Sequence, residues 1–147
     1  SWWGPRAKPD ARWPRADSLQ ELAQDSDILV ITAKADENNR GMISQEVIEA
    51  LGPDGLLINI ARGQLVDQAA LIAALKDGRL GGAGLDVYEY EPAINPKLLK
   101  LPNVVLMPHM GSATVEGRID MGEKVIINIK TFADGHRPPD RVIPAML

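Results

Sequence analysis

Cysteine is absent from the 147 residues, and histidine occurs only twice, as His109 and His136. Without cysteine the chain can form no disulfide and no thiolate metal site. Two histidines far apart in the sequence also argue against a histidine-based zinc site. We therefore expect a protein that binds no metal.

Long apolar runs and an excess of positive charge are absent as well. No run reaches the roughly 20 apolar residues that cross a bilayer, and the first residues lack the basic-then-apolar layout of a signal peptide. Lys and Arg number 16 against 20 Asp and Glu, a formal net charge of -4. This balance argues against a nucleic acid or an anionic membrane as partner. We expect a cytoplasmic protein that acts on a small solute.

The chain has the length and the 45% hydrophobic content of one compact domain. Short, almost continuously apolar runs alternate with helical patterns, which predicts parallel strands buried on both faces. The runs cover residues 27–32, 56–60, 83–88 and 104–107. The expected fold class is α/β, a Rossmann-type doubly wound parallel sheet.

Helix signals separate these runs. Asp67 is a predicted N-cap, and Gly78 follows the end of that helix. Ser18 and Glu21 form a capping-box pattern, and Ser44 can cap a helix that stops at residues 52–53.

The last third of the chain predicts one longer helix, over residues 113–133. Gly117 and Gly122 each weaken it by about 1 kcal/mol relative to alanine. Residues 135–144 contain Pro138, Pro139 and Pro144, which predict an extended segment.

Polar side chains follow three of the predicted strands, at the sheet edge where parallel α/β proteins bind ligands. Arg62 could hold a substrate carboxylate through two parallel hydrogen bonds. His109 could exchange a proton near neutral pH. Glu91 could hydrogen-bond the imidazole, favour its protonated form and hold its tautomer. Together they meet the requirements for reducing a 2-oxo acid.

Each residue alone also has an ordinary interpretation. Arg62 could be a surface arginine on a turn, His109 a structural histidine, and Glu91 a solvated loop acid. Asp86 could cap nearby amides at the end of its strand.

Three longer motifs, in order and properly spaced, resemble the D-isomer-specific 2-hydroxyacid dehydrogenases, particularly the glyoxylate and hydroxypyruvate reductases among them. The motifs are Asn-Ile-Ala-Arg-Gly-Gln-Leu-Val-Asp at 59–67, Gly-Gly-Ala-Gly-Leu-Asp-Val-Tyr-Glu-Tyr-Glu-Pro at 81–92, and Pro-His-Met-Gly-Ser-Ala-Thr at 108–114. The resemblance covers essentially the whole chain. It implies an oxidoreductase that transfers hydride between NAD(P)H and a small 2-oxo acid, with glyoxylate or hydroxypyruvate as substrate.

The resemblance also implies residue roles. Arg62 would bind the substrate, His109 would donate the proton, and Glu91 would support the histidine. Asp86 matches an acid near the nicotinamide ring. The other matched cofactor positions are Thr32, Ile60, Ala61, Arg62, Gly111 and Ser112.

One family feature is missing: the chain contains no Gly-x-Gly-x-x-Gly turn, whose amides would bind the cofactor pyrophosphate. We therefore expect a sheet truncated on its N-terminal side. Residues 1–134 would be a partial NAD(P)-binding domain, and residues 135–147 an extension returning toward the substrate domain. The chain alone should be inactive, and a homodimer is expected for the full-length protein.

Cofactor preference is predicted from the start of the chain, which should follow the second strand of the dinucleotide fold. NAD-preferring enzymes place an acid at that strand end. No acid precedes Asp10, whereas Arg6 and Lys8 offer cations to a 2′-phosphate. The sequence favours NADP(H) over NAD(H), although both cations could be ordinary solvated residues.

Two other classes of protein remain open. A non-enzymatic corepressor of the same fold would sense dinucleotide without turnover. A different dinucleotide enzyme, such as an amino-acid dehydrogenase, would not be expected to carry Arg62, Glu91 and His109 in this order.

Overall fold

The computed structural model describes residues 1–143 and 146. The chain divides into two compact units, Ser1–His109 and Met110–Leu147. The first unit contains the whole sheet, and the second contains the long helix near the C-terminus.

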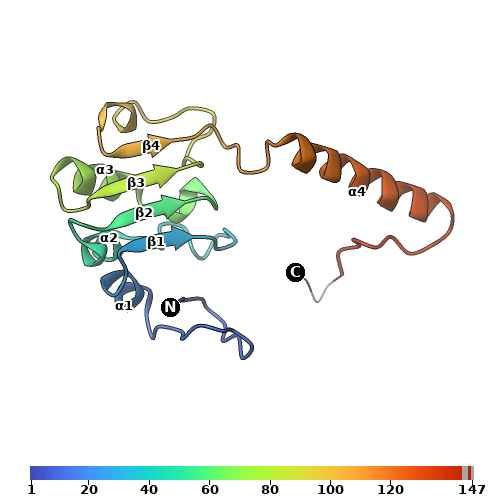
Figure 1. Cartoon of the computed structure of the whole chain (residues 1–147), viewed down its shortest axis with the longest axis horizontal. Coiled ribbons are helices and arrows are strands. Elements are labelled where there is room, and N and C mark those ends of the chain that lie inside the picture. The colour runs from blue at the N-terminus through green and yellow to red at the C-terminus, as the bar shows by residue number, and fades with distance from the viewer. Residues whose placement is uncertain (144–145, 147) are drawn as a thin grey trace. The chain divides into compact units, whose positions relative to one another are not determined.

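The sheet of the first unit has four parallel strands in the order β1-β2-β3-β4 (Figure 1). The strands are β1 (Ile28–Ile31), β2 (Leu56–Asn59), β3 (Gly82–Leu85) and β4 (Val104–Leu106). All four predicted apolar runs therefore form strands, each slightly shorter than predicted. With its flanking helices this is a Rossmann-like α/β fold, as the alternation of elements predicted.

Three helices connect or precede the strands: α1 (Leu19–Gln24), α2 (Gln45–Leu51) and α3 (Gln68–Lys76). The predicted caps of α1 and α3 are confirmed, because Ser18 accepts a hydrogen bond from the Glu21 amide and Asp67 from the Ala70 amide. Ser44 occupies the N-cap of α2, but its hydroxyl bonds the Glu46 carboxylate instead of a helix amide. Short 3-10 helices cover Gly63–Leu65 and Leu98–Lys100.

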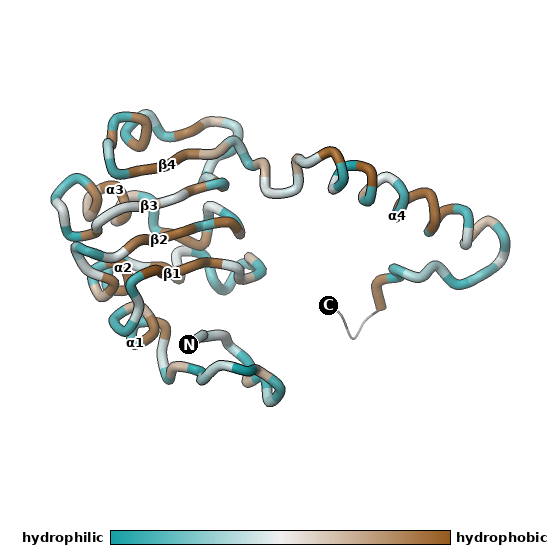
Figure 2. Tube along the Cα trace, viewed as in Figure 1, coloured by the Kyte–Doolittle hydropathy of each residue, from teal (hydrophilic) through white to brown (hydrophobic). Residues whose placement is uncertain are grey.

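The prediction that the strands are buried on both faces is wrong for this chain. On β1, Leu29 and Ile31 are buried, whereas Ile28 and Val30 are 54% and 50% exposed. Strands that are neighbours in both sequence and space, joined by right-handed crossovers, place every connecting helix on the same face. The opposite face presents apolar side chains, and Figure 2 shows the hydrophobic β1 and β2 within the sheet.

The core lies between the sheet and helices α1 to α3. It joins side chains of the helices, such as Leu22, Ile48 and Leu71, to strand residues such as Leu57. Burying a leucine or isoleucine of this kind contributes about 1.5–3 kcal/mol, so this layer supplies most of the unit's hydrophobic stabilisation.

The start of the chain forms no strand of the sheet. Trp2 forms only an isolated bridge with Arg15, and its amide bonds the Pro14 carbonyl. The segment therefore forms a loop in which Trp2 contacts residues 14 and 15. Trp3 packs against the core, whereas Trp13 is 61% exposed beneath the guanidinium of Arg12.

The second unit contains α4 (Val115–Ala133), which begins at the cap Thr114 and has no buried residue. This helix confirms the predicted one. Residues 135–143, after the helix, form no helix or strand, as predicted. Within this segment Asp140 forms hydrogen bonds with Lys124 and Asn128 of α4. Pro144, the last proline of that prediction, lies outside the described residues.

Among the described residues, no helix is both long enough and apolar enough to cross a membrane. The same part of the chain holds no group of three or more His, Cys, Asp or Glu side chains that could bind a metal ion.

Candidate active site

The loops that follow β2, β3 and β4 carry Arg62, Glu91 and His109, at the carboxyl edge of the parallel sheet. Parallel strands end at the same edge, so three residues distant in sequence are presented on one side of the first unit.

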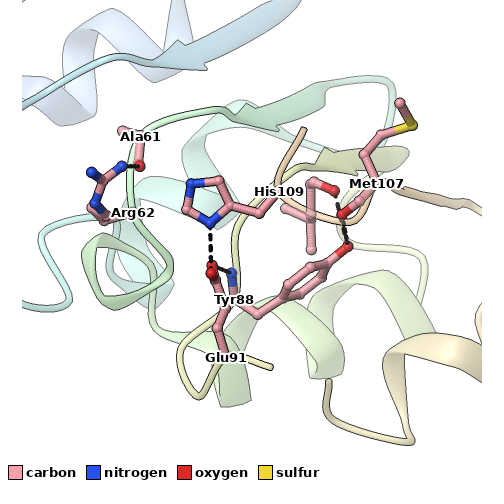
Figure 3. Close-up of polar contacts among 7 residues, drawn as sticks. Ala61, Arg62, Tyr88, Glu91, Met107 and His109 are labelled. Atoms are coloured by element: carbon pink, nitrogen blue, oxygen red, sulfur yellow. Dashed lines mark hydrogen bonds and ion pairs between the residues drawn. The ribbon is translucent and has the colours of Figure 1, made fainter. Parts of the chain in front are cut away.

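Glu91 and His109 form the closest polar contact of this edge. Nδ1 of His109 lies 2.5 Å from Oε2 of Glu91 (Figure 3). The other carboxylate oxygen accepts a hydrogen bond from the Tyr88 amide at 2.9 Å. The peptide bond between Glu91 and Pro92 is cis. Because Nδ1 faces the carboxylate, Nε2 is the ring nitrogen that can exchange a proton with a bound molecule.

The environment of Glu91 favours its charged form. Partial burial acts to raise its pKa, but the hydrogen bonds from His109 and Tyr88, with the charges of His109 and Arg62, outweigh it. The pKa of Glu91 therefore lies below its ordinary value of 4.5. Near neutral pH Glu91 is therefore a carboxylate anion in contact with the His109 ring.

The backbone at His109 is unusual. Its φ of 52° makes it the one non-glycine residue with a positive φ in the described part of the chain. The left-handed region is unfavourable for residues with a Cβ and is found preferentially at functional sites. This conformation belongs to the turn that brings the imidazole to Glu91.

Arg62 lies within electrostatic reach of the pair but does not bond to it. Its Nη1 donates to the Ala61 carbonyl at 2.6 Å, and the side chain is exposed (Figure 3). Its charge nevertheless contributes to lowering the Glu91 pKa. The structure thus pairs two of the three predicted catalytic residues and places the third nearby, accessible to a carboxylate from solvent.

An open groove of about 610 Å³ runs along the ends of β1 and β2. Its size is within the range of small-molecule sites. Small side chains line much of it, and Lys34 and Arg62 are its charged residues. The lining residues are Thr32, Ala33, Lys34, Ala35, Ile60, Ala61, Arg62 and Gln64. Of the predicted cofactor residues, Thr32, Ile60, Ala61 and Arg62 therefore share one groove, whose positive charge suits an anionic ligand.

The other predicted cofactor residues are not among those that line this groove. Asp86 directly follows β3, and its amide donates to the Asn59 carbonyl. Arg6 is exposed on the segment before α1. Gly111 and Ser112 belong to the second unit.

Two residues that shape the site had no role in the sequence interpretation. The backbone amide of Tyr88 donates a hydrogen bond to the Glu91 carboxylate. The buried Tyr88 hydroxyl donates to the carbonyl of Met107, two residues before His109, at 2.7 Å. Asn59 bonds the loop that carries Arg62. The sequence offered one sign of each: Tyr88 ends one predicted apolar run with a hydroxyl group, and Asn59 is a polar residue inside another.

Replacing Glu91 by Gln should change the pH dependence of the reaction. The variant keeps the shape of the side chain but loses the negative charge beside His109. An adjacent negative charge favours the protonated form of a base. In the reductive direction, the alkaline limb of the pH–rate profile should therefore move to lower pH. Steady-state rates measured across the pH range would test this. A profile that coincides with that of the wild type would contradict the pairing, and Glu89→Gln, in the same loop, is the matched control.

The fold and the site together define a class. A parallel α/β sheet with a cationic groove at its carboxyl edge and a carboxylate–imidazole pair beside it is typical of a dinucleotide-dependent oxidoreductase domain.

Comparison with known proteins places the chain within this class. Residues 3–111 match the NAD-binding domain model of the D-isomer-specific 2-hydroxyacid dehydrogenases. The chain belongs to this family.

Two curated relatives and one solved structure illustrate the similarity. A hydroxyphenylpyruvate reductase of Plectranthus scutellarioides is 47% identical over 92% of the chain and 43% of the relative. A glyoxylate/hydroxypyruvate reductase of Arabidopsis thaliana is 47% identical over 87% of the chain and 41% of the relative. An NADPH-dependent glyoxylate/hydroxypyruvate reductase from Sinorhizobium meliloti, solved with NADP and malonate, superposes with a TM-score of 0.84 at 37% identity, covering 88% of this chain and 41% of that one. The chain spans less than half the length of these relatives.

Proposed function

We propose that the protein containing this chain reduces small 2-oxo acids of the glyoxylate and hydroxypyruvate type to D-2-hydroxy acids with NAD(P)H. The observation that carries the proposal is the contact of His109 with Glu91 at the sheet edge, beside the cationic groove. It supplies an imidazole that a carboxylate orients through Nδ1, next to a site suited to anions.

In the proposed reaction, Arg62, His109 and Glu91 each have a separate role. The Arg62 guanidinium binds the substrate carboxylate and draws electron density from the adjacent carbonyl. Nε2 of His109 protonates the carbonyl oxygen as its bond to carbon becomes single, and Glu91 stabilises the imidazolium before transfer. A bound reduced nicotinamide supplies the hydride. The groove lined by Thr32 and Ile60 would hold that cofactor.

Relatives support the choice of substrate. Relatives that match most of this chain are named as reductases of hydroxyphenylpyruvate, of glyoxylate and hydroxypyruvate, and of 2-ketogluconate. These compounds share a carboxylate next to a ketone or aldehyde, the group that Arg62 and His109 are suited to bind and protonate.

An activity screen tests the proposal. The complete protein is incubated with glyoxylate, hydroxypyruvate and longer 2-oxo acids, each with NADPH and with NADH, and oxidation of the cofactor is followed by absorbance. We expect turnover with the two small acids. Dinucleotide binding without turnover of any acid would instead favour a corepressor of the same fold.

Cofactor preference is the finer part of the proposal: we expect NADPH to be used better than NADH. Arg6 is exposed on a segment that closes on itself through Trp2 and Arg15, while Lys8 lies over the Trp2 ring, 5.5 Å from its centroid. Arg6 is therefore the better placed of the two cations to reach a 2′-phosphate. A charge-assisted contact of this kind contributes about 1.5–3 kcal/mol, or roughly ten- to a hundredfold in affinity.

Arg6→Ala should accordingly remove most of the preference for NADPH. The ratio of kcat/KM with NADPH to kcat/KM with NADH, measured for the wild type and the variant, gives the result directly. Arg12→Ala is the matched control, since it removes the same charge from the same segment and should leave the ratio unchanged. Equal use of both cofactors by the wild type, or a preference that persists in Arg6→Ala, would refute the assignment.

The proposal includes a cytoplasmic homodimer as the working form of the complete protein. It also keeps residues 1–134 as part of the dinucleotide domain and residues 135–147 as an extension toward a substrate domain. The likeness of residues 3–111 to a dinucleotide-binding domain supports the assignment of the first of these segments.

A further inference from the structure

A buried amide side chain underlies the loop that carries Arg62. Asn59, the last residue of β2, is 1% exposed and is the one polar residue within the buried core of the described chain. Burying a carboxamide is unfavourable unless its hydrogen bonds are made. The hydrogen-bond partners of Asn59 therefore indicate its structural role.

Both ends of the carboxamide bind the backbone of the following loop. Oδ1 accepts from the Ala61 amide at 3.0 Å, and Nδ2 donates to the Arg62 carbonyl at 3.0 Å. The Asn59 carboxamide thus fixes the peptide group before Ala61 and the peptide group after Arg62. A single side chain thereby determines the course of the backbone at the predicted substrate-binding residue.

Asn59 itself is firmly held. It lies on β2, between β1 and β3, and its own carbonyl accepts a hydrogen bond from the Asp86 amide at 3.0 Å. Beyond Arg62, the Cα of Gly63 approaches the Tyr88 backbone so closely that a Cβ there would overlap it. The arginine loop is fixed by Asn59 before Arg62 and by this contact after it.

We propose that Asn59 is a positioning residue that sets the backbone of Arg62 for binding the substrate carboxylate. The inference rests on the proposed function, since it concerns how the same site binds a 2-oxo acid. A bidentate arginine contact depends on the direction of the guanidinium. Rotation of the Arg62 peptide would turn that direction even with the arginine unchanged.

The alternative is that Asn59 contributes only stability at the end of β2. A double-mutant cycle separates the two roles, because residues that act through one another have non-additive effects. Asn59→Ala, Arg62→Lys and the double variant are made in the complete protein. kcat/KM for glyoxylate and the Kd of oxamate, an unreactive analogue that carries the same carboxylate, are measured for each.

We expect Asn59→Ala to lower kcat/KM and to weaken oxamate binding by about tenfold or more, mainly through KM, in the otherwise wild-type protein. In the Arg62→Lys background the same change should have less than about a twofold effect. Leu57→Val is the matched control, because Leu57 is buried on the same strand and face and lacks the loop contacts. It should lower Tm without changing KM.

Equal effects of Asn59→Ala in both backgrounds, or a loss no greater than that of Leu57→Val, would overturn the inference. Should Asn59→Ala fail to fold, Asn59→Asp is used, since it keeps the volume and the acceptor oxygen and removes the amide donor to Arg62. The same comparison applies to it. If the wild type reduces no 2-oxo acid, the proposed function fails separately, and the oxamate Kd values still decide the role of Asn59.

Discussion

Arg62→Lys is expected to lower kcat/KM for glyoxylate by about ten- to a hundredfold while changing stability by less than about 0.5 kcal/mol. Lysine keeps the charge but cannot form two parallel hydrogen bonds to a carboxylate. The arginine side chain is exposed, and its described bond goes to the neighbouring Ala61 carbonyl, so little folding energy depends on it. Steady-state kinetics and thermal unfolding of the complete protein would be measured together.

Arg79→Lys is the matched control for this variant. Arg79 lies just before β3, at the sheet edge opposite the candidate site, where it forms ion pairs with Glu49 and Asp77. The same substitution there should leave kcat/KM unchanged. Near wild-type catalytic efficiency in Arg62→Lys would show that Arg62 does not bind the substrate carboxylate.

The 147-residue chain expressed alone is expected to bind neither NADPH nor NADH measurably and to catalyse no reduction. It lacks the Gly-x-Gly-x-x-Gly turn whose amides hold the pyrophosphate. One face of its sheet exposes apolar side chains such as Ile28, Val30 and Val105, and β1 forms an unpaired edge. Exposed apolar surface and unpaired strand edges also favour self-association.

Titration calorimetry and light scattering of the isolated chain, beside the complete protein at the same concentration, would measure these properties. We expect dinucleotide binding by the complete protein only, and association of the isolated chain. Micromolar affinity of the chain alone for either dinucleotide would mean that the groove at β1 and β2 binds the cofactor without a glycine-rich turn.

Local signals in the sequence were sufficient to predict the elements of the fold. The caps at Ser18 and Asp67 are set by side chains within three residues, and the strands by short apolar runs. The parallel sheet followed from their alternation. Strand order then placed Glu91 and His109 on one edge, because parallel strands end together.

Features that depend on distant parts of the chain were not predicted. A continuous apolar run shows that a strand can be buried on both faces, but burial of Ile28 and Val30 requires a second layer of structure. The roles of Asn59 and Tyr88 likewise depend on which backbone groups the fold brings to their polar atoms. Neither residue type predicts those partners.

Transfer of deuterium to the product tests the central claim most directly. The complete protein is incubated with hydroxypyruvate and NADPH that carries deuterium at both positions of nicotinamide C4, and the product is examined by mass spectrometry and chiral chromatography. The account predicts D-glycerate with one deuterium on C2, and a loss of this product in Arg62→Lys that parallels its kinetic defect. The L-isomer, or a product without deuterium at C2, would contradict hydride transfer by a D-2-hydroxyacid dehydrogenase.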